Sequence, residues 1–531
     1  MAHPQIRTGD AATVSLDPEL LRLLERPNES QVPTTRRIYV NRNLRMDQID
    51  LIGFDMDYTL AIYHMRRIEQ LSFDMTLALL VRQFGYPQVV ESIRYDHQFV
   101  MRGLVVDKEQ GNLLKMDRFN HVGRVYHGRQ LLDREAWRRL YRDEKIRLSS
   151  PRYAWIDTLF ALPEASMYAE VIELLEGRGE RVDYGKLYDD IREAIDTVHR
   201  DGSLKTEITK DLPAYVFRDP ELGPALHKLR SGGKKLFVLT NSLFDYTDAV
   251  MSHLLDGQLP EYPSWRNYFD LVVVGGSKPR FFTERHPFVE LDESGAVQAE
   301  AQSLERGKIY QGGNLVDLER MAGFGGERVL YVGDHIYGDI LKSKKTSLWR
   351  TCMIVEELEE ELAHMEASAD QMRHLAEAER LRARLEDELG LQKARLNALD
   401  RKLERGDVEG RSPAELEAMR QEAKRDLERV RRAVREIDGM VGHLAESLES
   451  GFNRYWGLIF KEGNENSRFG EQVEDYACLY TSRVSNFLFS SPMQYFRSPR
   501  EVMPHEVGFE ALSPFGGDSR RPGDRMADRG G

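Results

Sequence analysis

The sequence predicts an α/β fold whose core is a doubly wound parallel sheet, and three observations support this class. Four short runs are almost continuously apolar, as expected of strands covered on both faces of a parallel sheet. Helix-like stretches such as 221–229 and 315–321 alternate with these runs. Polar residues follow each run, at the end where ligands bind in such sheets. The four runs are residues 49–54, 235–239, 269–274 and 328–332.

Composition and charge narrow the class of protein. The chain has 531 residues, enough for roughly two to four domains, and 41% of them are hydrophobic. Its formal net charge of −13 argues against the uniformly basic surface of a nucleic-acid-binding protein. Two cysteines, Cys352 and Cys478, are too few for a disulfide framework. We find no apolar signal-peptide core and no run of about 20 apolar residues, so we expect a cytoplasmic protein without a membrane partner.

The spacing of the runs predicts an inserted domain. The interval between the first and second runs far exceeds the length of one crossover helix. We expect the core to comprise residues 36–63 and 206–355. Residues 64–205 are expected to form an inserted, mainly helical cap that contacts the substrate.

Residues 356–450 have a different pattern, which predicts a long antiparallel coiled-coil hairpin. Apolar residues recur there at intervals of three and four, and charged residues occupy most other positions. Ser412, Pro413 and Glu415 have the residue types of a capping box at the start of the second helix. Such an arm usually serves structure or oligomerisation. Three segments remain. Residues 1–35 are expected to be a flexible N-terminus, residues 451–512 an aromatic-rich segment packing on the core, and residues 513–531 a disordered tail.

The most informative stretch is LIGFDMDYTL at residues 51–60, where Asp55 and Asp57 follow the first run. Two carboxylates at the end of a buried strand repel each other, and Mg²⁺, which prefers oxygen ligands, would remove that repulsion. Asp55 would then be placed to attack a phosphorus atom. Asp57 would protonate the leaving alkoxide and then activate water. A DxD pair alone is weak support, because such pairs are common on protein surfaces.

The other three runs end in residues that fit the same chemistry. Thr240 and Asn241 follow the second run, and the Thr240 hydroxyl can donate to a phosphoryl oxygen. Lys278 follows the third run and offers positive charge to a phosphoryl group. Asp334 follows the fourth run as a metal ligand, with Asp339 nearby. Each residue alone also fits an ordinary cap, loop or turn, but their joint occurrence at four strand ends favours a phosphoryl-transfer site.

Together, the motifs DMDYT, LTNS, KP and GDHIYGD resemble the four motifs of the haloacid dehalogenase superfamily. The stretches FGYPQ, GNLLKMD, DTLFALPE, VHRDGSLK, NSLFDYTD and MPHE narrow the resemblance to the cytosolic purine 5′-nucleotidase family, over about residues 36–508. The resemblance implies a Rossmann-like, haloacid dehalogenase-like core. It also implies Mg²⁺-dependent hydrolysis of purine nucleoside 5′-monophosphates, with IMP and GMP preferred, through an aspartyl-phosphate. Phosphoryl transfer to a nucleoside is the alternative fate of that intermediate.

The resemblance implies a role for each motif residue. Asp55 matches the nucleophile and a Mg²⁺ ligand. Asp57 matches the acid/base, and its backbone carbonyl also reaches the metal. Asp334 matches the remaining protein ligand, which Asp339 supports without binding the metal itself. Lys308 is an alternative to the charge-neutralising lysine, in surroundings that match less well. The phosphate-binding turn and the preferred lysine are Thr240, Asn241, Ser242 and Lys278.

Part of the insertion resembles the family's nucleoside pocket. In LYDDIREAIDTVHRDGSLK, the residues Arg192, Asp196 and His199 share one face of a predicted helix, and Lys205 follows the next turn. Asp196 can accept a hydrogen bond from a purine ring N–H, and Arg192 and Lys205 can donate to its carbonyl. A solvated helix face with an i,i+4 ion pair explains the same pattern. The resemblance favours the pocket and adds Phe160 as the aromatic that stacks on the base.

The resemblance also implies a homo-oligomer, dimer or tetramer, and a site for a nucleotide effector. Arg147, Tyr337 and Lys345 fall where that effector would bind, although Asp157 there would repel a polyphosphate. Two other functions stay open from the sequence. One is a phosphatase of another small phosphate ester. The other is a non-enzymatic interaction protein in which the helical arm binds the partner.

Overall fold

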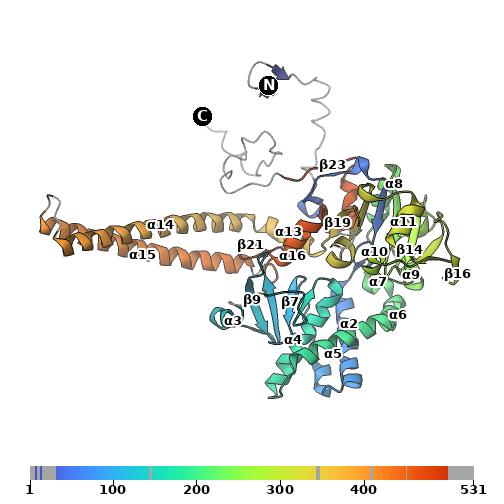
Figure 1. Ribbon diagram of the computed structural model, residues 1–531, viewed down its shortest axis with the longest axis horizontal. Coiled ribbons are helices and arrows are strands. Elements are labelled where there is room, and N and C mark those ends of the chain that lie inside the picture. The colour runs from blue at the N-terminus through green and yellow to red at the C-terminus, as the bar shows by residue number, and fades with distance from the viewer. Residues whose placement is uncertain are drawn as a thin grey trace. The chain divides into compact units, whose positions relative to one another are not determined.

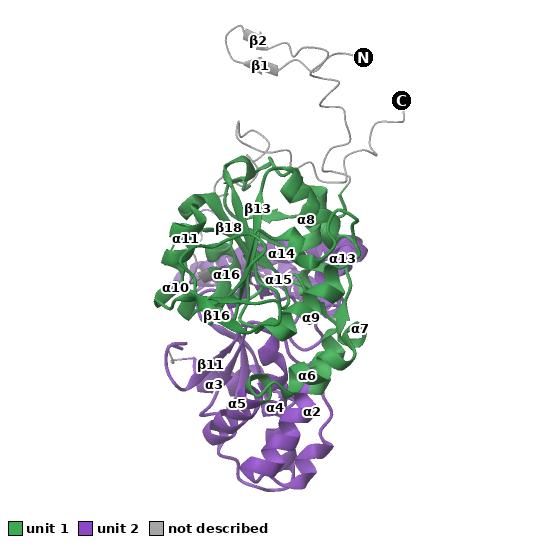
Figure 2. Cartoon of the chain, turned by 90° about the vertical axis from the view of Figure 1, so that its right-hand side faces the viewer, with its two compact units in different colours: residues 1–71, 198–359, 472–531 green, residues 72–197, 360–471 purple. Residues whose placement is uncertain are grey.

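The computed structural model describes residues 32–142, 146–341, 347–406, 410, 412–449 and 451–499, and also the short paired strands β1 (Ile6–Thr8) and β2 (Ala12–Val14). The chain divides into two compact units (Figure 2). Unit 1 comprises residues 1–71, 198–359 and 472–531, and unit 2 comprises residues 72–197 and 360–471. Within the described parts of the chain, no helix is both long and apolar enough to span a bilayer.

Unit 1 is built on a ten-stranded sheet in which the strands from β17 to β22 are parallel, and this confirms the predicted α/β class. Strand β5 lies in the middle. The chain passes from it to β13 and β14 on one side, and later to β18 and β19 on the other, so the strand order reverses beside β5. In sheet order, the strands are β16 (Val297–Glu300), β15 (Phe288–Leu291), β17 (Ile309–Gly312), β14 (Leu271–Val274), β13 (Lys235–Leu239), β5 (Leu51–Phe54), β18 (Val329–Gly333), β19 (Arg350–Ile354), β22 (Leu479–Thr481) and β3 (Tyr39–Val40).

The four predicted runs are all strands of this sheet because their side chains are buried on both faces. All residues of β5, β14 and β18 are buried, and a Cβ at Gly53 would lie only 2.1 Å from the Phe237 ring. Trp349 and Tyr331 belong to the same buried cluster. The helices and minor strands of unit 1 are α6 (Ser203–Lys210), α7 (Leu212–Tyr215), α8 (Leu222–Ser231), α9 (Phe244–Leu255), α10 (Arg280–Thr283), α11 (Leu315–Ala322), β4 (Leu44–Arg45) paired with β23 (Tyr495–Phe496), and β6 (Ile62–Tyr63) paired with β12 (Val216–Phe217).

Unit 2 contains a five-stranded antiparallel sheet, which the sequence did not predict, beside the helices that make up the larger part of the insertion. Its strands are short and contain polar residues, such as Lys115 in the buried strand β8, so neither a continuous apolar run nor a regular alternation marks them in the sequence. In sheet order they are β10 (Gln130–Leu131), β9 (Val122–His127), β8 (Asn112–Met116), β7 (Leu104–Asp107) and β11 (Tyr153–Ile156). The helices of the insertion are α3 (Arg134–Tyr141) and α4 (Leu162–Gly177), with α2 (Met65–Phe84) and α5 (Tyr184–Arg200) at its two boundaries.

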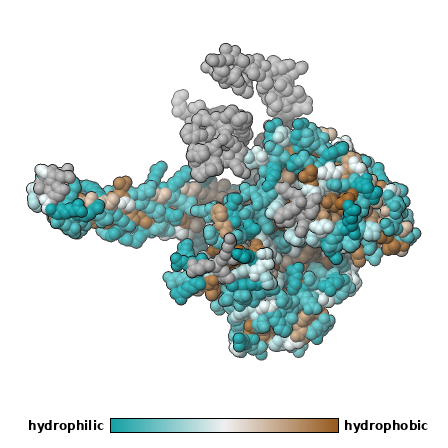
Figure 3. Space-filling view, in the orientation of Figure 1, coloured by the Kyte–Doolittle hydropathy of each residue, from teal (hydrophilic) through white to brown (hydrophobic). Residues whose placement is uncertain are grey.

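Helices α14 (Ala369–Arg405) and α15 (Pro413–Glu449) pair along their length and follow α13 (Glu357–Ala367) (Figure 1). Ala378 packs with Ile437, and Leu399 packs with Leu416, so the two helices run antiparallel. The predicted capping box is present, because the Ser412 and Glu415 side chains each bond the other residue's backbone N–H, at 3.2 and 2.7 Å. The side of the pair visible in Figure 3 is mostly hydrophilic, as expected of a solvated face.

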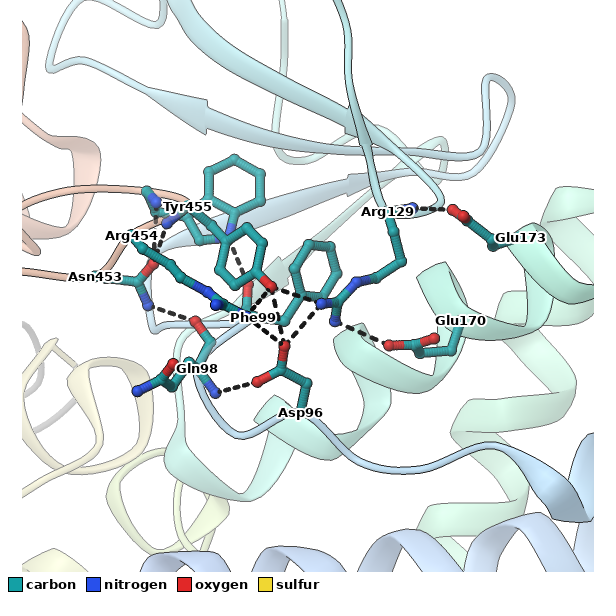
Figure 4. A network of polar contacts seen from close by, with 10 residues as sticks. Asp96, Gln98, Phe99, Arg129, Glu170, Glu173, Asn453, Arg454 and Tyr455 are labelled. Carbon is teal, nitrogen blue, oxygen red and sulfur yellow. Dashed lines mark hydrogen bonds and ion pairs between the residues drawn. The ribbon is translucent and has the colours of Figure 1, made fainter. Parts of the chain in front are cut away.

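The segment after α15 is divided between the units, whereas the sequence led us to expect one segment packing on the core. Residues 451–471 belong to unit 2. There the Tyr455 hydroxyl and the Arg129 guanidinium both donate to Asp96, at 3.0 and 2.7 Å (Figure 4). Arg129 also lies over the Phe99 ring. The remaining strands and α-helix of the described residues are β20 (Lys461–Glu462), β21 (Glu465–Asn466) and α16 (Arg468–Tyr476).

Candidate active site

Three carboxylates meet at the carboxyl ends of the two central strands of unit 1. Asp55 directly follows β5, and Asp334 directly follows β18. The Asp55 N–H donates to Val332 at 2.9 Å, which extends the ladder between these strands and brings the two aspartates together. One carboxylate oxygen from each of Asp55, Asp334 and Asp339 lies within 4.8 Å of the others. A Cβ at position 333 would lie 2.6 Å from the Asp339 side chain, so Gly333 permits this approach.

Lys278 joins two of these carboxylates. Its Nζ lies 2.9 Å from Asp55 Oδ1 and 2.6 Å from Asp339 Oδ1, and it donates to the Tyr331 hydroxyl at 3.0 Å. Burial lowers the pKa of Lys278, but the charges of Asp339 and Asp55 outweigh this effect, so its pKa is raised and the lysine is cationic. Burial raises the pKa of Asp55, and the charge of Lys278 lowers it. The neighbouring carboxylates raise it further, so the pKa of Asp55 lies well above its usual value.

The donor set fits a hard divalent cation. Asp55, Asp334 and Asp339 are buried or nearly so, and when ionised their three negative charges exceed the one positive charge of Lys278. All three side chains offer carboxylate oxygens, the ligands that Mg²⁺ prefers. Asp339 was expected to support the metal site without binding the ion, yet its carboxylate lies within 4.8 Å of those of Asp55 and Asp334, the two expected carboxylate ligands.

The turn after β13 holds the backbone of Lys278. The Asn241 side chain accepts from the Lys278 N–H at 2.6 Å and donates to the Lys278 carbonyl at 3.0 Å. Thr240 Oγ1 accepts from the Ser242 N–H at 3.0 Å. This contact leaves the hydroxyl hydrogen of Thr240 able to donate to another group. The structure therefore brings Thr240, Asn241, Ser242 and Lys278 together, as the sequence predicts.

Asp57 is half-buried, and both of its oxygens accept hydrogen bonds. Oδ1 accepts from the Tyr63 hydroxyl at 2.5 Å, and Oδ2 accepts from Ser242 Oγ at 2.7 Å. Lys205, which we had predicted as a base contact, lies with its Nζ 3.0 Å from Ser242 Oγ. Ser242 therefore links Lys205 to Asp57 within unit 1.

The other predicted base-binding residues fall in different parts of the chain. Phe160, in a 3-10 turn (Leu159–Ala161), and the α5 residues Arg192 and Asp196 belong to unit 2, whereas His199 belongs to unit 1. Arg192 donates to Glu164 at 2.8 Å and lies 3.6 Å from Asp196. The predicted i,i+4 ion pair is therefore present, with a buried glutamate added to it.

Several residues of these networks were not found from the sequence. Tyr331 was missed inside an apolar strand, where one tyrosine in RVLYV was the available signal. Tyr63 and Glu164 also gave no motif-level signal. The alternative lysine, Lys308, pairs instead with Glu290 at 3.1 Å. Of the expected effector residues, Arg147 is in unit 2 and Tyr337 is in unit 1. Lys345 lies outside the described residues. The stretch MPHE also lies outside them.

Comparison with known proteins gives a family match over most of the chain. Residues 38–508 match the model of the 5′ nucleotidase family. The chain is 31% identical over 487 residues to a 5′-nucleotidase domain-containing protein of Dictyostelium discoideum, covering 90% of this chain and 76% of that protein. It is 30% identical over 483 residues to 5′-nucleotidase domain-containing protein 2 of Rattus norvegicus, covering 88% of this chain and 80% of that protein.

Two solved structures show weaker likeness. The 2-haloacid dehalogenase from Pseudomonas syringae is 16% identical with a TM-score of 0.20, over 58% of this chain and 86% of that one. The protein CbbY from Rhodobacter sphaeroides, solved with phosphate, is 14% identical with a TM-score of 0.20 over the same shares. At these values, nothing about the activity of this chain follows from them.

Proposed function

This chain belongs to the 5′ nucleotidase family of hydrolases, and we propose on that basis that it hydrolyses purine nucleoside 5′-monophosphates with Mg²⁺, preferring IMP and GMP. One observation carries the proposal. Asp55 lies beside Lys278 and two further carboxylates at the strand ends, and Asp57 follows two residues later. A nucleophile, a cation and an acid are thus available at one place.

The proposed ligands of Mg²⁺ are Asp55, Asp334 and the backbone carbonyl of Asp57, with Asp339 as a further carboxylate. When bound, Mg²⁺ supplies charge that neutralises the phosphoryl oxygens. Lys278 adds positive charge to the same group, and the Thr240 hydroxyl donates to it. These residues would orient the phosphorus for attack by Asp55.

The proposed reaction has two steps. An Asp55 carboxylate oxygen bonds to phosphorus while the bond from phosphorus to O5′ breaks, and Asp57 gives its proton to O5′. Water then loses a proton to Asp57 and attacks phosphorus, which releases phosphate and restores the Asp55 carboxylate. When a nucleoside hydroxyl replaces water in the second step, the enzyme acts as a phosphotransferase.

For recognition of the base, we propose stacking on Phe160 and polar contacts from Arg192, Asp196, His199 and Lys205. The support is that Glu164 anchors the Arg192 guanidinium, whose side chain is still 48% exposed and keeps donors for a ligand. A pocket used for another small phosphate ester is the alternative. It would leave the strand-end chemistry unchanged.

We further propose a cytoplasmic homo-oligomer, dimer or tetramer, with an effector site for a nucleotide. Cys352 and Cys478 are both free thiols and buried, as suits a reducing compartment. Light scattering of the purified protein would measure the oligomeric state. Activity with and without added ATP would test the effector.

Phosphate release from a panel of nucleoside 5′-monophosphates and sugar phosphates, with Mg²⁺ and with excess chelator, tests the proposal. Mg²⁺-dependent release that favours IMP or GMP is expected. Release from sugar phosphates alone would keep the strand-end chemistry and overturn the base pocket. No release, even with ATP present, would overturn the enzyme assignment and favour an interaction protein.

A further inference from the structure

Asp57 is the centre of a hydrogen-bond chain that reaches beyond the predicted motifs. The hydroxyls of Tyr63 and Ser242 both donate to Asp57, which is the arrangement of its ionised form, the form left after it gives a proton to the leaving oxygen. The Tyr63 hydroxyl has one hydrogen, which it uses on Asp57. The Tyr246 hydroxyl lies 2.9 Å from that of Tyr63 and must therefore donate to it. The chain runs in one direction, from Tyr246 through Tyr63 to Asp57 Oδ1.

The second oxygen of Asp57 has a matching chain. The Lys205 ammonium is a donor only, so Ser242 Oγ accepts from it and gives its own hydrogen to Asp57 Oδ2. Lys205 Nζ also lies 4.9 Å from the centre of the Tyr246 ring. Lys205 thus contacts both Ser242 and Tyr246 and joins the two chains that end on Asp57.

The tyrosines are held by the fold. Tyr63 lies on β6, opposite Val216 of β12, and is 2% exposed. Tyr246 lies on α9 and is 7% exposed. The Tyr58 ring packs against Tyr63 with centroids 4.9 Å apart, and Tyr58 itself has a left-handed backbone, with φ of 54°. A tyrosine rarely adopts that conformation, so packing holds the turn directly after Asp57.

We propose that Tyr63, supported by Tyr246, is a positioning residue that fixes the rotation of the Asp57 carboxylate for proton transfer to the leaving oxygen. With Oδ1 held by Tyr63, Oδ2 is turned toward Ser242 and the phosphate-binding turn. This inference rests on the proposed function, because it assigns Asp57 as the acid. Neither tyrosine contacts substrate in this role. Both act through Asp57.

A comparison of two leaving groups distinguishes a loss of acid positioning from general damage to the site. A nucleoside leaves as an alkoxide, which needs a proton, whereas p-nitrophenolate is stable without one. For Tyr63→Phe, we expect kcat with IMP to fall about 10-fold or more, since a well-placed general acid contributes on the order of 100-fold. KM should change less than about 2-fold, because the group acts on the chemical step. With p-nitrophenyl phosphate, kcat should fall far less.

Two further variants complete the experiment. Tyr246→Phe removes only the hydrogen bond from Tyr246 to Tyr63, so it should show the same selective loss of kcat with IMP, but a smaller one. If Tyr63→Phe fails to fold, Tyr246→Phe serves as the test variant. Tyr268→Phe is the matched control, a buried tyrosine of unit 1 whose hydroxyl has no hydrogen-bond partner within the described structure. It should behave as the wild type with both substrates.

The outcomes separate this inference from the function on which it rests. A selective loss with IMP in Tyr63→Phe supports positioning of Asp57. An equal loss with both substrates, an effect on KM alone, or no effect overturns it while the nucleotidase assignment stands. A wild-type protein that releases phosphate from neither substrate overturns the proposed function and this inference together.

Discussion

Replacing Lys278 by methionine tests the charge balance of the strand-end site. The side chain of Lys278 is 3% exposed and contacts carboxylates of Asp55 and Asp339, whose side chains are 12% and 1% exposed. Methionine keeps much of the volume but leaves these carboxylates without their cation. Removing one partner of a buried ion pair costs about 3–5 kcal/mol, so we expect Lys278→Met to lower the free energy of unfolding by about that amount in excess chelator.

The assay is urea unfolding of both proteins, with chelator and then with Mg²⁺. Mg²⁺ should stabilise Lys278→Met more than the wild type, because the variant has a larger uncompensated negative charge at the ion's ligands. Lys308→Met is the control, since its ion pairs with Glu290 and Glu305 are at the surface and should matter little. Equal losses in both variants, or equal stabilisation by Mg²⁺, would refute the description of the cluster as a charge-balanced cation site.

Three further predictions concern separate parts of the molecule. Asp55→Asn should abolish turnover while unfolding stability is kept or raised, because it removes one of several repelling carboxylates. Appreciable turnover in this variant would exclude Asp55 as the nucleophile. Arg192→Leu leaves Glu164, which is 1% exposed, without its cation, and should cost about 2 kcal/mol in urea unfolding. Adding Glu164→Gln should recover part of that loss, and no recovery would contradict the pairing. Burial lowers the pKa of Lys115 from 10.5 to about 8, so the unfolded chain binds more protons between these values and stability rises with pH there. From pH 7.5 to 9.5, the wild type should gain about 2 kcal/mol relative to Lys115→Met, and parallel pH profiles would contradict this.

The fold of unit 1 could be predicted from the sequence because four neighbouring strands of its sheet, β14, β13, β5 and β18, are unambiguous. Each of the four runs is buried on both faces, which leaves a continuous apolar signal. Strands β17 and β22 gave no such signal, since they are four and three residues long and partly exposed. The sheet of unit 2 was missed for a related reason. Its buried strand β8 contains Asn112 and Lys115, whose polar side chains interrupt the apolar pattern.

The contacts around the predicted site also could not be predicted from the sequence. Asn241 was found in a motif, but its clamp on the Lys278 backbone follows from pairing β13 with β14. Tyr63 and Tyr246 are 183 residues apart, so their contact has no local sequence signal. The ion pair of the buried Glu164 with the half-exposed Arg192 likewise joins two different helices.

The sequence by itself determined which residues stand at the ends of four strands. Because parallel strands present their carboxyl ends at one edge, residue types at those ends were enough to predict Asp55, Thr240, Lys278 and Asp334 as neighbours. Only the tertiary structure decided how each side chain is held. Orientation depends on contacts between segments far apart in the chain, such as Tyr63 on Asp57, and these contacts form only when the sheet and its helices pack.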